Sequence, residues 1–199
     1  MTRRSRGDMI RETRSKLIAA ARDAFGRLGY AGTSMDDFTA SAGLTRGALY
    51  HHFGDKTGLL RAVVETLDAE MDERLDAASA TADLWAGFVS RCRLFLEMAL
   101  EPEIRQIVLK DAPTFLGADD LAPGRRRCLA SLATRLSAMM AEGSVRQADA
   151  EALARMINGA LADAALWIAE ADDPTPRLAS AIDSLDLMLG GLKAIPGKV

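Results

Sequence analysis

The stretch TSMDDFTASAGLTRGALYHHF, residues 33–53, decides the fold expected of this chain. Thr33 and Ser34 can cap a short helix whose first turn holds acidic side chains, where the helix dipole favours negative charge. Gly43 then supplies a residue that tolerates positive φ, and Thr45 is a natural N-cap for a second short helix. The stretch therefore predicts a helix, a tight turn and a second helix, with the motif itself at about residues 34–53.

The second short helix has one apolar side and one open side. On a helical wheel Leu49 and Phe53 fall on one side with Thr45, while Gly47 and His51 point the other way. Because the open side has little bulk near its start, this helix can approach base edges in a DNA major groove about 12 Å wide. Side chains around it that can donate to bases or phosphates are those of Thr33, Ser34, Arg46, Tyr50, His51 and Lys56.

Positive charge is concentrated at the front of the chain. Residues 1–56 hold 10 Lys and Arg against 6 Asp and Glu, whereas residues 57–199 hold 15 against 22, within a net charge of −3. This division is typical of a protein whose basic end neutralises the phosphates of DNA while the rest of the chain is acidic. Arg46 is long enough to reach a guanine, the commonest specific contact to a base. An ordinary uneven surface is the alternative explanation of the charge, and capping alone is the alternative role of Thr33 and Ser34.

The sequence offers little for other kinds of chemistry. Cys92 and Cys128 have neither CxxC spacing nor a neighbouring histidine, which argues against a zinc site and a disulfide framework. The two histidines, His51 and His52, diverge by about 100° on a helix and cannot share one ligand. We therefore expect no catalytic residues, no metal and no cofactor. The cysteine usage fits a reducing cytoplasm, so we expect a cytoplasmic protein. Because no apolar signal core or run of about 18 apolar residues is found, we expect neither export nor a membrane partner.

The remaining sequence has helical periodicity, so the fold class that we expect is all-α, with about nine helices. Gly29 should end the first helix and Gly143 the seventh, while a proline should stop the sixth near Pro113. The helices expected outside the motif cover about residues 11–28, 55–78, 85–99, 104 to near 113, 125–142, 153–167 and 178–192, with a loop at 114–124.

The last two helices carry apolar residues at alternating steps of 4 and 3. Such steps form a narrow straight seam, which is typical of bundled helices that pack at about 20°. Two seams per chain predict a four-helix bundle between two chains, and the alternative is that both seams face the core of their own chain. The residues expected at this dimer interface are Leu153, Ile157, Ala160, Ala164, Leu178, Ile182, Leu185 and Leu189.

Residues ~11–60 resemble the DNA-binding domain of the tetracycline-repressor (TetR) family. The resemblance rests on Gly32-Thr33-Ser34 with Asp37, on the run from Ala42 to Phe53, on Asp55-Lys56 and on Leu59-Leu60, whereas Phe38-Thr39 departs from the family pattern. It implies three DNA-binding helices within residues 1–56 and a helical bundle for ligand binding and dimerisation over residues 57–199. By this resemblance Thr45, Arg46, Gly47 and Ala48 face bases, and Thr33, Ser34, Tyr50, His51 and Lys56 face phosphates.

The resemblance also implies a function and an effector. A homodimer would repress by binding a palindromic operator, and a small molecule in the bundle would release it; a TetR-like activator and a helical ligand-binding or adaptor protein without DNA contact are the alternatives. Aromatic and sulfur side chains favour an apolar or aromatic effector, although plain core packing explains each of them as well. Arg91, Arg93 and Asp111 are the nearest charges, and we expect them at the surface. The candidate lining residues are Trp85, Phe88, Cys92, Phe95, Met98, Phe115, Met139 and Trp167.

Overall fold

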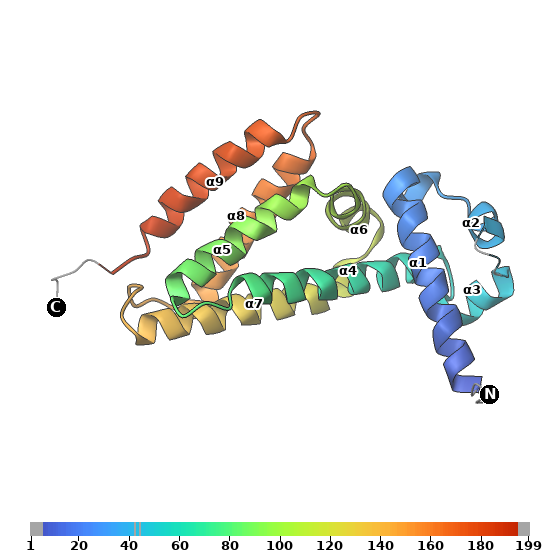
Figure 1. The fold of residues 1–199 in the computed structure, drawn as a ribbon, viewed down its shortest axis with the longest axis horizontal. Coiled ribbons are helices and arrows are strands. Elements are labelled where there is room, and N and C mark those ends of the chain that lie inside the picture. The colour runs from blue at the N-terminus through green and yellow to red at the C-terminus, as the bar shows by residue number, and fades with distance from the viewer. Residues whose placement is uncertain (1–5, 42, 44, 195–199) are drawn as a thin grey trace. The chain divides into compact units, whose positions relative to one another are not determined.

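The computed structural model describes residues 6–41, 43 and 45–194 of the 199-residue chain. Within these ranges every regular element is helical, apart from an isolated β-bridge between Val145 and Lys193, and the all-α prediction is confirmed. In chain order the elements are α1 (Arg6–Gly32), α2 (Met35–Ser41), α3 (Arg46–Phe53), α4 (Lys56–Ala78), α5 (Leu84–Glu97), the 3₁₀ turn η1 (Met98–Leu100), the π-helix η2 (Ile104–Asp111), α6 (Ala112–Phe115), α7 (Ala118–Ala141), α8 (Ala150–Ala169) and α9 (Thr175–Gly190) (Figure 1).

The chain forms two compact units. Unit 1 comprises residues 1–68 and 102–121, and unit 2 comprises residues 69–101 and 122–199. This division differs from the predicted boundary after residue 56, because η2 packs on α1, and α6 on η2, although both follow α5 in sequence. Each unit is described separately below.

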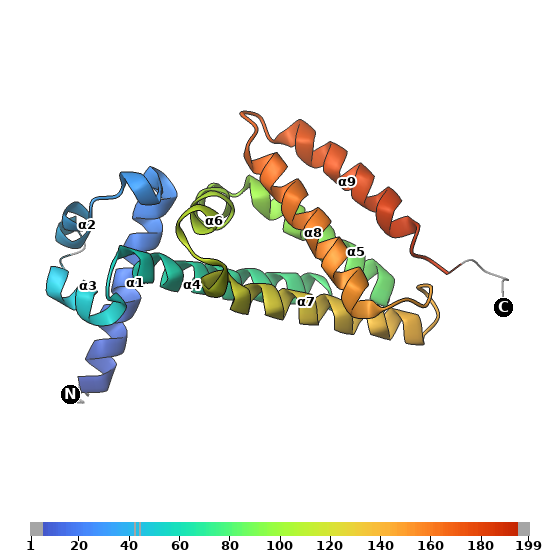
Figure 2. The ribbon, with the colours of Figure 1, turned by 180° about the vertical axis from the view of Figure 1, so that it is seen from behind.

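Unit 1 is built around the apolar face of α1. Leu17 and Phe25 of α1 are fully buried against Leu49 of α3 and against Leu59 and Leu60 of α4. Figure 2 shows α2 and α3 together on one side of α1. The helical spacing of the apolar residues in α1 therefore fixes where α3 is anchored.

The end of α1 is held by a buried carboxylate. The sequence predicted that Gly29 ends this helix; its backbone is non-helical, with φ 71°, and α1 resumes beyond it as far as Gly32. The next amide, Tyr30 N, donates to Oδ2 of Asp111 at 2.8 Å, and Gln106 Nε2 donates to Oδ1 at 3.1 Å. The expectation that Asp111 lies at the surface was wrong: it is buried, and these two donors supply a hydrogen bond to each of its carboxylate oxygens.

The predicted stop near Pro113 and the predicted loop at residues 114–124 were both wrong. Pro113 lies in the first turn of α6, which follows η2 directly, and the helix continues to Phe115. The helix α7 already begins at Ala118, because Gly117 N donates to Oδ2 of Asp120 at 3.1 Å and caps the first turn. Pro123 lies inside α7 without ending it.

In unit 2, α5, α8 and α9 pack on one another (Figures 1 and 2). Three residues of the predicted dimer seam, Ile157, Leu185 and Leu189, are buried in this core, so for them the prediction was wrong. Alternating steps of 4 and 3 fit any helix pair at a shallow angle, including one within a chain. Of the other seam residues, Ala160 is exposed, and Leu153, Ala164, Leu178 and Ile182 are half-buried.

The helix α8 is also long and apolar enough to cross a membrane by length and composition. Its buried side chains, among them Ala154, Leu161 and Ile168, pack within unit 2. A core helix of this kind passes the same test of composition, so the test alone is weak evidence for a membrane span.

Candidate nucleic-acid interface

The motif at residues 33–53 has the predicted geometry. Gly43 lies in the left-handed region with φ 64°, and its amide donates to the carbonyl of Ala40 at 3.1 Å. Thr45 is the N-cap of α3, and its hydroxyl accepts from Ala48 N at 3.1 Å. Residues 42 and 44 of the predicted turn lie outside the described residues. The prediction of a helix, a turn and a second helix is therefore confirmed.

The helix α3 presents one face to the core and the other to solvent. Leu49 is fully buried, and Phe53 is half-buried with the guanidinium carbon of Arg14 at 5.3 Å from its ring centroid. On the outer face Gly47 and His51 are exposed, as are the flanking Arg46 and Tyr50, while Ala48 is half-buried. A helix held by one buried leucine and open near its start suits entry into a groove.

Arg46 is held across the turn by α2. Its Nε lies 2.8 Å from Oδ1 of Asp36, and both side chains are more than half exposed. The sequence analysis missed this pair, because it assigned the acidic residues of α2 only to the helix dipole. Exposed ion pairs contribute about 0–1 kcal/mol, so Arg46 can exchange this carboxylate for a base or a phosphate.

The phosphate role predicted for the Thr33 side chain is not supported. Thr33 is buried, and its hydroxyl donates to the carbonyls of Gly29 at 2.8 Å and Ala24 at 3.3 Å. It closes the turn after α1 instead. Ser34 is exposed at the start of α2.

Lys56, at the start of α4, lies beside an aromatic ring. Its Nζ is 4.3 Å from the ring centroid of Tyr30, whose hydroxyl is 3.0 Å from Oγ1 of Thr57. Partial burial lowers the pKa of Lys56, and the negative charge of Asp111 opposes that shift. The ammonium is therefore held in a defined position at the end of the motif.

The two histidines of α3 differ in environment. His51 is exposed, whereas His52 is half-buried with its ring centroid 5.4 Å from that of His51. Burial lowers the pKa of His52, and the positive charges of His51 and Arg14 add to this shift. At neutral pH His52 is therefore a neutral packing residue, and His51 is the histidine on the outer face.

The junction between α3 and α4 depends on a glycine that the sequence analysis did not single out. A Cβ at Gly58 would lie 2.0 Å from the carbonyl oxygen of Phe53. Gly58 N also donates to Oδ1 of Asp55 at 2.7 Å, which caps α4. Because two backbones meet here, no side chain fits at this position.

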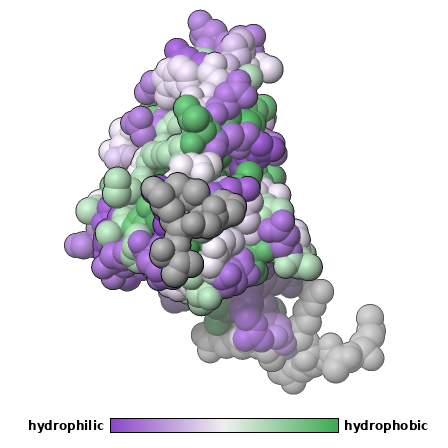
Figure 3. Space-filling view, turned by 90° about the vertical axis from the view of Figure 1, so that its left-hand side faces the viewer, coloured by the Kyte–Doolittle hydropathy of each residue, from purple (hydrophilic) through white to green (hydrophobic). Residues whose placement is uncertain are grey.

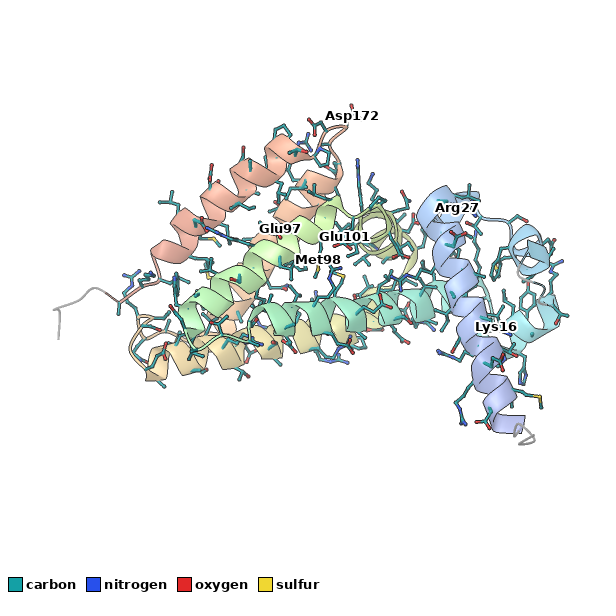
Figure 4. The ribbon with its side chains drawn as sticks, viewed as in Figure 1. Lys16, Arg27, Glu97, Met98, Glu101 and Asp172 are labelled. Atoms are coloured by element: carbon teal, nitrogen blue, oxygen red, sulfur yellow. The ribbon has the colours of Figure 1, made fainter. Side chains whose placement is uncertain are left out.

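The eight side chains predicted to line one ligand pocket are spread over several places in the described part of the chain. Phe88, Met139 and Met98 (labelled in Figure 4) are buried in the core of unit 2. Trp85 lines a cleft with Arg93 and Lys193, and Trp167 lines a groove between α8 and α9. Phe115 belongs to unit 1, with its ring centroid 4.4 Å from that of Tyr30. Of the eight, only Cys92 and Phe95 line the cavity described next.

A small cavity in unit 2 contains a buried arginine. The volume of the cavity is about 10 Å³, and the arginine that lines it, Arg91, is 3% exposed. The expectation that Arg91 lies at the surface was wrong, because α5 places it on the same inward face as Phe88 and Cys92. The lining residues are Leu75, Arg91, Cys92, Phe95, Cys128, Leu132, Asn158 and Leu161.

We expect iodoacetamide to label Cys128 faster than Cys92 at neutral pH. Burial raises the pKa of the Cys92 thiol to about 12, although the charge of Arg91 opposes the shift, so the nucleophilic thiolate is nearly absent. Cys128 is half-buried, and its thiol donates to Oδ1 of Asn158 at 3.2 Å. Peptide mapping after increasing labelling times measures both rates, with Cys128→Ser as the control. Equal rates for the two cysteines would contradict the buried position of Cys92.

The exposed second helix of this motif, together with a separate helical unit, defines a helix-turn-helix DNA-binding protein. Two family models match the sequence: the bacterial regulatory proteins of the tetR family over residues 17–63, and the tetracyclin repressor-like C-terminal domain over residues 85–192. The chain belongs to the TetR family of transcriptional regulators. The matched families and relatives are regulators, not enzymes.

Individual relatives agree with this assignment. The chain is similar to the crystal structure of a TetR-family transcriptional regulator from Pectobacterium atrosepticum, with 52% identity, a TM-score of 0.87 and coverage of 97% of this chain and 100% of that one. It is 36% identical to the HTH-type transcriptional regulator CymR of Pseudomonas putida over 120 residues. This match covers 60% of this chain and 51% of CymR. The chain thus spans about half the length of this curated relative, and 39% of the regulator TtgR of the same species, at 40% identity.

Proposed function

We propose that the chain acts as a homodimeric repressor, which binds a palindromic operator through α3 and is released by a small molecule bound in unit 2. The observation that carries the DNA-binding part is the outer face of α3, where Arg46, Gly47, Tyr50 and His51 are exposed while Leu49 anchors the helix. A dimer on a promoter represses by blocking polymerase. This activity belongs in the cytoplasm, where the DNA is.

The side chains around α3 divide into two groups. Gly47 and Ala48 are small enough to let the start of α3 approach the bases, and Arg46 can reach a guanine. The Thr45 hydroxyl accepts from Ala48 N and keeps its own proton for a further acceptor. The groups that we assign to phosphates are those of Ser34, Tyr50, His51 and Lys56.

The direct test is retention of duplex DNA by the purified chain. We expect a gel shift with the promoter region of its own gene at low salt, and binding that weakens steeply as salt rises. If no duplex is retarded at low salt, the chain is instead a helical ligand-binding or adaptor protein.

We expect Lys56→Ala to weaken binding to all duplexes alike and to reduce the slope of log K against log salt by about 1. The reason is that the ammonium, held 4.3 Å from the Tyr30 ring centroid, would contact a phosphate and no base. Lys193→Ala is the matched control, because Lys193 also lies over an aromatic ring, that of Trp85, but in unit 2. Titrations of operator and scrambled duplex at several salt concentrations measure the slope. An unchanged slope would remove Lys56 from the interface.

The dimer that we propose uses the apolar side chains that α8 and α9 leave exposed. Leu187 is 82% exposed and Met156 72%, and such side chains on packed helices commonly mark an interface. The end of unit 2 seen in Figure 3 carries hydrophobic patches between hydrophilic residues. The other exposed large apolar residues of these helices are Leu166, Trp167 and Met188.

We expect Leu187→Arg to convert the dimer to a monomer while the helical content stays unchanged. The exposed Leu187 contributes nothing to the core of its own chain, whereas an arginine there would bury a charge between two chains. Leu84→Arg, at another exposed leucine of unit 2, is the control. Light scattering should give twice the chain mass of 21.3 kDa for the wild type and the control. A wild-type mass of one chain would contradict the dimer.

A further inference from the structure

The most unusual charge in unit 2 is the buried guanidinium of Arg91. Its side chain lies within the wall of the small cavity, where the other lining residues are mainly apolar. A buried charge is costly unless its hydrogen-bond donors find acceptors. The donors of Arg91 therefore indicate what else the cavity has to hold.

Arg91 has five N–H donors and one acceptor among the described residues. Its Nη1 donates to Oδ1 of Asp76 at 2.8 Å, and the same oxygen accepts from Nη2 of Arg135 at 2.9 Å. One carboxylate thus serves two guanidinium groups, and one positive charge is left over. The Nε of Arg135 is itself buried without an acceptor. These three side chains together carry a net charge of +1, and the Asp76 side chain is 60% exposed to solvent.

The rest of the cavity wall adds a second donor and an apolar surface. Asn158 accepts the Cys128 thiol through Oδ1 at 3.2 Å, and within the described part of the chain its NH₂ group donates to no acceptor. Leucines and Phe95 form the apolar part of the wall. Two polar donors in an apolar wall suit a ligand that combines a carboxylate with a hydrocarbon group.

We propose that this cavity binds a small organic monocarboxylate with an apolar chain or ring, and that its carboxylate accepts hydrogen bonds from Arg91 and Asn158. This inference names the chemical class of the proposed effector, and the effector role of the carboxylate rests on the proposed function. It replaces the apolar or aromatic effector expected from the sequence with an amphipathic anion. A carboxylate supplies the missing negative charge, which a neutral compound does not.

The size of the cavity makes binding a conformational event. A volume of about 10 Å³ holds about one water molecule, so a carboxylate with a chain or ring must displace side chains such as Phe95. The ligand then selects an expanded state of unit 2 over the closed one. This differential affinity is what an effector requires.

Cys128 lines the cavity and allows binding to be tested at the site itself. The full chain is labelled with iodoacetamide in the presence of straight-chain carboxylates from acetate to decanoate, or of benzoate, and in each case of the matching primary amide. We expect at least one acid to slow the labelling of Cys128 about ten-fold and to raise the melting temperature, while its amide does neither. If every acid protects no better than its amide, the cavity binds none of these carboxylates and the proposal is overturned.

Two variants locate the carboxylate. Asn158→Asp keeps the shape of the side chain but adds a negative charge, so it should abolish protection by the acid. Arg91→Met should do the same, and Arg93→Met is the control because Arg93 pairs with Asp186 away from this cavity. Should Arg91→Met fail to fold, Asn158→Asp and the comparison of acid with amide still decide. Full protection in Asn158→Asp would overturn the proposal.

A gel shift of the wild type with and without the protecting acid separates this inference from the proposed function. Release of DNA by the acid, but not by its amide, supports both the carboxylate site and the proposed function. Protection of Cys128 without release overturns the effector role of the carboxylate. Absence of DNA binding without any acid contradicts the proposed function, while protection of Cys128 would still support the carboxylate site.

Discussion

Replacing Arg46 with alanine should abolish the preference of the protein for its operator over unrelated duplex DNA. Arg46 lies at the start of α3, and its side chain is 58% exposed. A bidentate contact to guanine discriminates by about 1–3 kcal/mol, and a dimer makes the contact twice. The expected loss of preference is therefore about 2–6 kcal/mol, or at least about 30-fold.

The ion pair with Asp36 does not change this expectation. Both partners are exposed, so the pair contributes little and its loss leaves the fold of the motif intact. Arg27→Ala is the matched control, because Arg27 (labelled in Figure 4) is also exposed in unit 1 and pairs with Asp23 within α1. Fluorescence anisotropy at one salt concentration, with the tightest-binding duplex and a scrambled one, measures the ratio of affinities. An unchanged ratio in Arg46→Ala would exclude Arg46 as a base-reading residue.

Replacing Gly58 with alanine should destabilise the protein by at least about 2 kcal/mol and remove operator binding. The added Cβ would lie 2.0 Å from the carbonyl oxygen of Phe53, and that oxygen belongs to the backbone and cannot rotate away. Either α3 or α4 must move, and the cap between Gly58 N and Asp55 would break with it. Both consequences displace the reading helix.

The control for this change is Gly26→Ala in α1. A Cβ at Gly26 meets only Cγ of Glu103, at an ordinary 3.9 Å, so the substitution should stabilise the helix by up to about 1 kcal/mol. Urea unfolding followed by circular dichroism measures both changes, and operator titration shows their effect on binding. Wild-type stability and affinity in Gly58→Ala would contradict the close approach of the two backbones.

The motif was predictable because its signals are local. A positive φ at Gly43 and the cap at Thr45 depend on neighbouring residues alone, and both are observed as the sequence predicted. The same holds for Gly29 and Gly143, whose positive φ marks the ends of regular helix. Glycines in turns and capping residues thus predict where these helices begin and end.

What the sequence did not reveal depends on distant partners. Arg91 is buried because Asp76, fifteen residues earlier, accepts from it, and Asp111 is buried because of an amide at Tyr30. Periodicity shows that a helix has an apolar face but not which neighbour covers it. For that reason Ile157 and Leu185 were predicted to lie at an interface with a partner chain, although they are buried within their own chain.

The central claim is that α3 reads DNA, and selection from a pool of random duplexes tests it most directly. The full chain is mixed with the pool at moderate salt, and the retained duplexes are sequenced over several rounds. We predict enrichment of an inverted repeat, whose half-sites are about one helical turn or a multiple of it apart. Retention of no duplex, or retention without enrichment of any sequence, would contradict the claim.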